Sequence, residues 1–131
     1  MTSITVITYG TFDLFHLGHV QILHRLREHG TRLVVGVSTD EFTALKGKTC
    51  VFPYDHRRRI VAALRDVAEV FPEHCWEQKR EDIVRYGAAI FGMGDDWVGA
   101  FDDLTDLCQV VYLPRTPGVC SSALRARLGA A

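Results

Sequence analysis

Short apolar runs rich in β-branched residues alternate in this chain with segments of helical periodicity. This alternation constrains the fold more than any other feature. We predict buried strands over residues 4–8, 32–37, 67–71, 88–93 and 109–113, with Pro72 and Pro114 ending two of them. Helices are predicted over residues 17–29, 55–66, 77–86 and 121–128, and a loop over 38–41. Such an alternation favours a parallel sheet with helices on both faces.

The 131 residues of the chain have the size of one domain. With right-handed crossovers, the predicted elements give an α/β fold, a single Rossmann-like doubly wound domain over residues 1–131 with a five-stranded parallel sheet. Ligands of such sheets bind beyond the carboxyl ends of the strands, where the strand order reverses. The segments that follow the strands are therefore where functional residues are expected.

Composition excludes several classes of partner. There are 15 basic and 16 acidic residues, so the chain lacks the strongly basic character typical of nucleic-acid binding. No apolar run approaches the roughly 20 residues of a membrane span, and no secretory signal pattern is present. The four cysteines match no zinc spacing and are predicted to be free thiols. We expect a soluble cytoplasmic protein that binds neither nucleic acid nor membranes.

The segment after the first predicted strand reads YGTFDLFHLGH, residues 9–19. His16 and His19 are three residues apart at the start of a predicted helix, so they are expected to share one face. Gly18 leaves the backbone open to a ligand, and the helix N-terminus adds partial positive charge and N–H donors. The pattern predicts a phosphate site with imidazole donors. The alternative is one surface histidine and one capping histidine beside a turn glycine.

A second group of ligand-binding residue types follows the last predicted strand. Residues 115–122 read RTPGVCSS. Gly118 permits a tight turn, Ser121 or Ser122 can cap the following helix, and Arg115 supplies a fork of donors suited to phosphate. The structural alternative is an ordinary serine-capped terminal helix. We predict that this turn faces the histidine turn and that the two enclose one triphosphate.

These motifs together resemble a known family. GTFDLFHLGH is similar to the signature of the HxGH nucleotidyltransferases, and its GTFD form points to the cytidylyltransferase branch. The segments STDEF, HRR, WEQK, MGDDW and VYLPRTPGVCSS extend the resemblance, and they narrow it to the bacterial glycerol-3-phosphate cytidylyltransferase family. Two residues depart from that family's usual pattern. Pro117 stands in place of an acidic residue and Cys120 in place of a hydroxyl residue.

The resemblance implies a role for each candidate residue. His16, His19, Lys48 and Arg115 are predicted to act in catalysis, Lys46 and Lys79 to bind the acceptor, and Asp13 to contact a metal. The predicted nucleotide site consists of Thr11, Phe12, His16, Leu17, Gly18, His19, Lys48, Asp96, Arg115, Thr116, Pro117, Gly118, Val119, Cys120, Ser121 and Ser122. Asp96 is assigned to the exocyclic amine of cytosine, which uracil lacks.

The activity implied by the resemblance is transfer of CMP from CTP to glycerol 3-phosphate. The products are CDP-glycerol, which commonly feeds teichoic acid synthesis, and pyrophosphate. The acceptor phosphate is largely ionised at neutral pH, so direct in-line attack requires no general base. Mg²⁺ is the expected cofactor, with Asp13 as its candidate protein ligand; the alternative role for Asp13 is to orient a histidine. A homodimer is the expected assembly. The alternatives are another small phosphate acceptor such as ribitol phosphate or phosphoethanolamine, adenylyl transfer from ATP, or a non-catalytic CTP-binding module.

Overall fold

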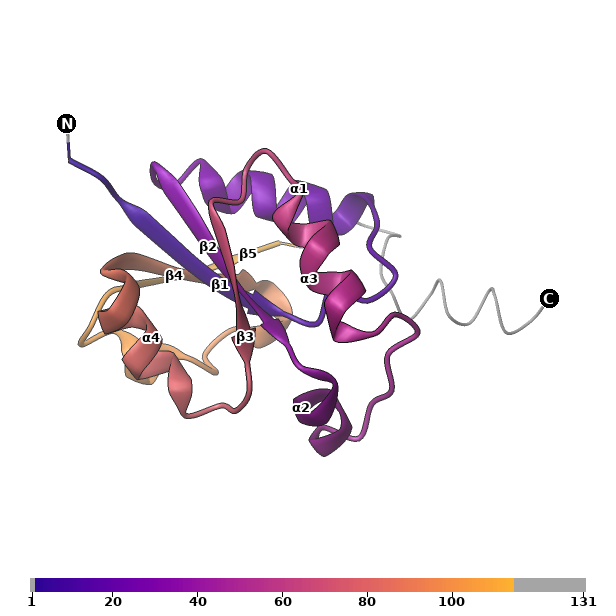
Figure 1. Cartoon of the computed structure of the whole chain (residues 1–131). Helices are drawn as coiled ribbons and strands as arrows, with labels where there is room; N and C mark the ends of the chain where they lie inside the picture. Colours follow the sequence, from indigo (N-terminus) through magenta and orange to yellow (C-terminus); the bar gives the residue numbers. More distant parts are fainter. Residues whose placement is uncertain (1, 115–131) are drawn as a thin grey trace.

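The computed structural model describes residues 2–114, and within them five strands form one parallel sheet. The strands are β1 (Thr5–Gly10), β2 (Arg32–Ser38), β3 (Glu69–Glu73), β4 (Ala88–Gly94) and β5 (Gln109–Leu113). Their order is β3-β2-β1-β4-β5, so the chain runs outward from β1 to β3 and then returns to the other side of β1 (Figure 1). The predicted α/β fold with a five-stranded parallel sheet is confirmed, and the strand order reverses between β1 and β4.

Helices cover both faces of the sheet. The helices α1 (Leu17–Arg27) and α3 (Tyr54–Ala62) lie on one face, and α4 (Gln78–Tyr86) lies on the other (Figure 1). The second face also holds the short 3₁₀ helix Asp102–Leu104, whose Leu104 is buried in the same core as Ile83 of α4. No helix within residues 2–114 has the length and apolar character needed to cross a membrane.

Two apolar cores follow from the alternation of side chains along buried strands. Val6 of β1 packs with Leu23 and Leu26 of α1, whereas its neighbour Ile7 packs on the opposite face with Ile83 of α4. In β2, Val35 lies in the same core as Val6, and its neighbour Val34 lies in the same core as Ile7. The sheet is therefore buried on both sides, and its carboxyl edge is left as the place where loops can build a site.

Two local predictions were wrong. Residues 38–41 do not form a loop, because the helix α2 (Asp40–Leu45) begins there; the Thr39 hydroxyl accepts a hydrogen bond from the Phe42 N–H at 3.1 Å and caps the helix. Pro72 does not end a strand but lies inside β3. Its carbonyl accepts a hydrogen bond from the Gln78 side chain on the outer side of this edge strand, where a missing N–H costs no ladder bond.

Several element ends also differ from the prediction. The helix predicted to reach residue 29 ends at Arg27, and the one predicted over 55–66 spans Tyr54–Ala62. The helix predicted over 121–128 lies outside the described residues.

Candidate functional site

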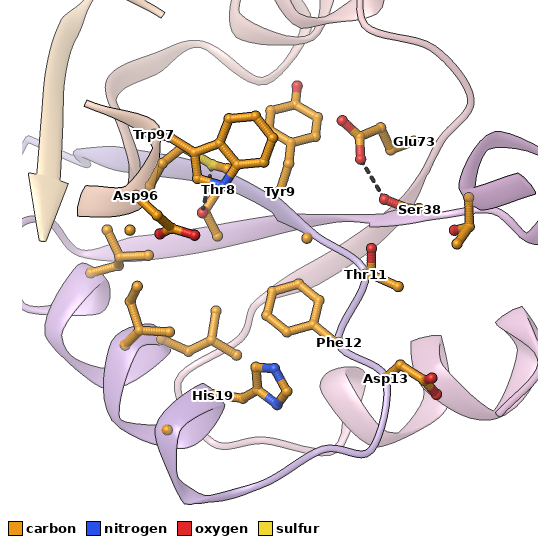
Figure 2. Close-up of a pocket in the computed structure, with 18 of the residues that line it drawn as sticks. Thr8, Tyr9, Thr11, Phe12, Asp13, His19, Ser38, Glu73, Asp96 and Trp97 are labelled. Atoms are coloured by element: carbon orange, nitrogen blue, oxygen red, sulfur yellow. Dashed lines mark hydrogen bonds between the residues drawn. The ribbon is translucent and has the colours of Figure 1, made fainter. Parts of the chain in front are cut away.

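A pocket of about 320 Å³ opens at the carboxyl edge of the sheet, beside the reversal of strand order. Loops after β1, β2, β3 and β4 contribute to its walls, together with the start of α1 (Figure 2). The lining includes these residues with a predicted role: Thr11, Phe12, Asp13, His16, Gly18, His19, Lys46, Lys48, Lys79 and Asp96. Leu17 is absent from the lining, and 59% of its surface is exposed.

The two histidines are held by the backbone at the start of α1. His16 is the N-cap residue, and its Nδ1 accepts a hydrogen bond from the Gly18 N–H at 3.0 Å. The Nδ1 of His19 accepts one from the His16 N–H at 3.1 Å, which completes a reciprocal capping box. The rings stack with their centroids 3.9 Å apart, as their spacing predicted. Both histidines therefore cap the helix, and this capping fixes the orientation of their rings in the pocket wall.

This capping fixes the tautomer of both imidazoles. A nitrogen that accepts a backbone N–H carries no proton, so each neutral ring bears its hydrogen on Nε2. Burial lowers the pKa of His16, and burial together with the neighbouring His16 lowers the pKa of His19 to about 4. Both rings are neutral donors at neutral pH. The Nε2 of His16 is buried without a hydrogen-bond partner within residues 2–114, as expected of a donor reserved for a ligand.

Acid is expected to destabilise the fold through His19. The pKa of its ring is near 6.5 in an unfolded chain and about 4 in the folded protein. The unfolded state therefore binds more protons between these values, and stability rises with pH across them. The contribution is fully present above the unfolded pKa and is lost as pH falls toward the folded one, by at most about 3 kcal/mol.

The variant His19→Asn isolates this effect because it removes the titrating ring. Urea unfolding from about pH 7.5 to 4.5 should show the wild type losing about 2 kcal/mol more than the variant. Parallel stability curves for the two proteins would contradict the proposed burial of a neutral His19.

The loop between β1 and α1 is held in a sparsely populated backbone conformation. Phe12 and Leu14 have positive φ angles of 55° and 50°. Between them the buried carboxylate of Asp13 accepts hydrogen bonds from the N–H groups of Val51 and Phe52, at 2.7 and 2.9 Å. Asp13 therefore connects the histidine loop to the loop that carries Lys48.

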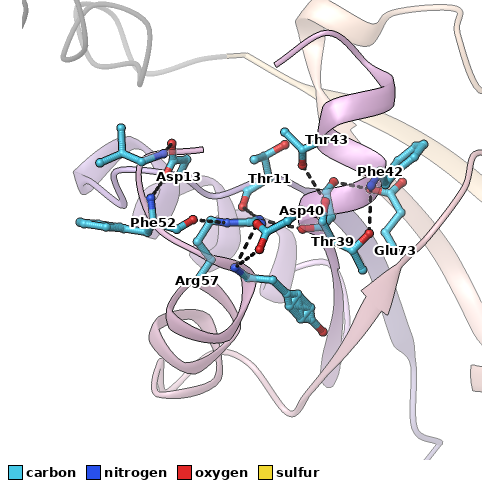
Figure 3. Close-up of polar contacts among 12 residues, drawn as sticks. Thr11, Asp13, Thr39, Asp40, Phe42, Thr43, Phe52, Arg57 and Glu73 are labelled. Atoms are coloured by element: carbon cyan, nitrogen blue, oxygen red, sulfur yellow. Dashed lines mark hydrogen bonds and ion pairs between the residues drawn. The ribbon is translucent and has the colours of Figure 1, made fainter. Parts of the chain in front are cut away.

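The side chain of Arg57, on α3, is fully buried and joins separate segments of the chain by hydrogen bonds (Figure 3). Its guanidinium donates to the carbonyls of Thr11, Ser38 and Phe52 at 2.7–2.9 Å and pairs with Asp40 at 2.7 Å. These acceptors lie just after β1, at the last residue of β2, in the loop before α3 and at the start of α2. Arg57 therefore sets the spacing of these segments.

One half of the pocket is built from lysines, a carboxylate and aromatic rings. Lys79 is buried and forms an ion pair with the buried Glu73 at 2.6 Å. Glu73 also accepts a hydrogen bond from the Ser38 hydroxyl at 2.7 Å, and the Lys46 ammonium lies 3.3 Å from the same hydroxyl. The ring of Trp76 lies beside both ammonium groups, 4.6 Å from that of Lys79 and 5.6 Å from that of Lys46. This half can hold a small anion.

The opposite half of the pocket follows β4. Gly94, Asp96 and Trp97 line it, and the last two belong to the 3₁₀ helix Asp95–Trp97 (Figure 2). A Cβ at position 94 would lie 2.9 Å from the Asp96 carboxylate, so a side chain there would displace that carboxylate. Trp97 packs against Trp76 with ring centroids 5.7 Å apart, so the aromatic wall joins both halves. The planar surfaces and the carboxylate of this half suit a nucleobase.

The second predicted loop lies outside the described residues. It comprises Arg115, Thr116, Pro117, Gly118, Val119, Cys120, Ser121 and Ser122. The last described residue, Pro114, accepts a hydrogen bond at its carbonyl from Arg25 of α1, and Arg25 lines the pocket. The prediction that this loop faces the histidine turn remains a prediction.

The described residues do not form a metal-binding site of their own. Within residues 2–114, no three His, Cys, Asp or Glu side chains gather in a way that could hold an ion. Both carboxylate oxygens of Asp13, the predicted ligand, already accept backbone N–H groups. Within the same range Cys50, Cys75 and Cys108 are free thiols, as predicted.

The comparisons with known proteins agree with this geometry. A family model described as cytidylyltransferase-like matches residues 7–127. The chain belongs to this family. It is 51% identical over 120 residues to a glycerol-3-phosphate cytidylyltransferase of Bacillus subtilis (strain 168), across 92% of this chain and 93% of that relative. The resemblance that the motifs indicated is confirmed.

Two further matches support the family and the fold. This cytidylyltransferase-like chain is 44% identical to a glycerol-3-phosphate cytidylyltransferase of Staphylococcus aureus (strain NCTC 8325 / PS 47), across 94% of this chain and 93% of the relative. A lipopolysaccharide core biosynthesis protein from Thermoplasma volcanium GSS1 superposes with a TM-score of 0.74 at 22% identity. That match covers 88% of this chain and 99% of the other, and it supports the fold alone.

Sequence reasoning missed part of the cytidylyltransferase-like pocket. Ser38, Glu73 and Arg25 line it, and none was a candidate. Ser38 follows a predicted strand directly, and Glu73 lies two residues beyond another. Their position at the carboxyl edge of the sheet was a signal that could have made both candidates. Trp76 and Trp97 also line the pocket, and neither was named as a candidate.

Proposed function

We propose that this protein transfers CMP from CTP to glycerol 3-phosphate and releases CDP-glycerol and pyrophosphate. The observation that carries the proposal is one pocket that combines two neutral imidazole donors, three lysines and an aromatic wall ending in Asp96. It is supported by the near full-length similarity to two glycerol-3-phosphate cytidylyltransferases.

Each part of the pocket takes one part of the reaction. Lys46 and Lys79 bind the acceptor phosphate, while Trp97 and Asp96 contact the cytosine. The CTP phosphates lie between the acceptor and the cytosine, where His16, His19 and Lys48 contact them. Arg115 and the seven residues after it are assigned to the same phosphates on the sequence pattern and the resemblance. A homodimer in the cytoplasm is the expected state, on the same grounds.

The reaction is a direct displacement at the α-phosphorus of CTP. An oxygen of the acceptor phosphate, already ionised near neutral pH, forms the new P–O bond as the bond to pyrophosphate breaks. The Nε2–H groups of His16 and His19 donate to the charge that builds on the phosphate oxygens, and the lysines hold the acceptor in line. Mg²⁺ would bind together with CTP and would supply charge neutralisation at the phosphates, with Asp13 as the protein carboxylate proposed to hold it.

A panel of acceptors tests the proposal. With CTP and Mg²⁺, glycerol 3-phosphate should give CDP-glycerol with a kcat/KM about 10²-fold above that of ribitol phosphate or phosphoethanolamine, because a misfitting acceptor leaves polar groups unpaired. Pyrophosphate release and mass spectrometry of the product provide the measurement. Faster turnover with another acceptor would reassign the substrate, and a preference for ATP would reassign the nucleotide. CTP binding without pyrophosphate release would indicate a non-catalytic module.

A further inference from the structure

We propose that Glu73 is a positioning residue for the acceptor phosphate, which holds the ammonium groups of Lys46 and Lys79 in place without itself contacting substrate. The inference rests on the proposed function, in which these two lysines bind the acceptor. Glu73 lies at the carboxyl end of β3, and only 3% of its surface is exposed.

The contacts of Glu73 connect both lysines. One carboxylate oxygen accepts the Lys79 ammonium at 2.6 Å, and the other accepts the Ser38 hydroxyl at 2.7 Å. That hydroxyl in turn lies 3.3 Å from the Lys46 ammonium. A single carboxylate thus fixes an ammonium group from α4 directly and one from the end of α2 through Ser38 (Figure 2 shows the Glu73–Ser38 contact).

The charges explain why an anion site contains a buried acid. Two ammonium groups close together and withdrawn from water repel each other. Burial lowers the pKa of Lys46, and the neighbouring Lys48 and Lys79 lower it further, whereas Glu73 raises it. One carboxylate between two lysines leaves one net positive charge. The pair therefore remains attractive to a phosphate dianion.

The ion pair also leaves Lys79 able to bind. An ammonium group has three donors, and Glu73 accepts one of them. The rings of Tyr9 and Trp76 lie 4.6 Å from the Lys79 nitrogen, and their faces attract the ammonium group. The ion pair and the two rings hold this ammonium group in place at the pocket lining, and such preorganisation is what in-line transfer requires.

The variant Glu73→Gln tests the inference because it keeps the shape and an acceptor oxygen and removes the charge. We expect the KM for glycerol 3-phosphate to rise about tenfold or more, with kcat and the KM for CTP changed by less than about threefold. The matched control is Asp82→Asn. Asp82 is a second buried carboxylate beside the pocket, and its partners within residues 2–114 are Tyr9 and Gln78 rather than a lysine. The acceptor KM of this control should stay near that of the wild type.

A second variant tests the same inference in case Glu73→Gln does not fold. Ser38→Ala keeps the Glu73–Lys79 pair and removes only the link to Lys46. The acceptor KM should rise about threefold, again without a change in the KM for CTP. An unchanged or lower acceptor KM in either folded variant would overturn the inference, and a lower value would mean that Glu73 competes with the phosphate.

Binding measurements separate this inference from the proposed function. Both tryptophans of the chain line the pocket, so their fluorescence can follow titration with glycerol 3-phosphate or inorganic phosphate. A wild type that binds these anions but turns over no glycerol 3-phosphate would refute the proposed function alone. Equal anion affinity of the wild type and Glu73→Gln would refute the positioning role alone.

Discussion

Replacing His19 with asparagine is expected to lower kcat by about 10²-fold or more, the usual loss for one preorganised donor to developing charge. The amide oxygen of the introduced asparagine can still accept the His16 N–H, so the start of α1 and its capping should survive. What disappears is the Nε2–H that faces the pocket. Steady-state pyrophosphate release at saturating CTP and acceptor measures the effect, with circular dichroism as the check on folding.

The matched control for this prediction lies on the same helix. His24 of α1 is exposed and contacts Asp66 and Glu28, away from the pocket lining. His24→Asn should keep a wild-type kcat. Normal turnover in folded His19→Asn would remove this imidazole from the mechanism, and the tautomer argument would then apply to His16 alone.

The second large effect is expected on stability. Arg57→Met should lower the free energy of unfolding by about 3 kcal/mol or more, because it strands the buried carbonyls of Thr11 and Ser38 and breaks the pair with Asp40. Methionine fills a similar volume and offers no donor. A loss of this size is a large fraction of the roughly 5–15 kcal/mol typical of a folded domain. Urea unfolding followed by circular dichroism measures it.

Arg59→Met provides the comparison from the same helix. The Arg59 side chain is 70% exposed, and its ion pair with Asp55 lies on the surface. Its removal should leave the unfolding midpoint close to that of the wild type, since exposed pairs contribute little. A similar midpoint for Arg57→Met and Arg59→Met would show that the buried network does not hold the loops together.

The sheet and the histidine turn could be predicted from the sequence because each depends on local pattern. Runs such as RLVVGV do not alternate between apolar and polar residues, so their burial on both faces of a parallel sheet could be predicted. HLGH directly after a strand could be placed at the carboxyl edge by topology alone. In contrast, α2 was missed because its six residues carry too little periodicity, and its start depends on one capping hydroxyl at Thr39.

The contacts that organise the pocket could not be predicted in the same way. The partners Glu73 and Ser38 are 35 residues apart, and Arg57 meets the Thr11 carbonyl across 46 residues. No spacing rule connects such positions, because their proximity arises only when the strands align. The carboxylate of Asp13 illustrates the same limit. Nothing in the local sequence indicated that the Val51 and Phe52 amides would donate to its two oxygens.

The strand order has a consequence for how this pocket could be redesigned. Because β1 lies between β2 and β4, the lysine half and the Asp96 half stand on opposite sides of the histidine turn. Under the proposed function, loops after β2 and β3 choose the alcohol phosphate and the loop after β4 chooses the base. Libraries restricted to one flank could therefore exchange one substrate while the other flank keeps its partner.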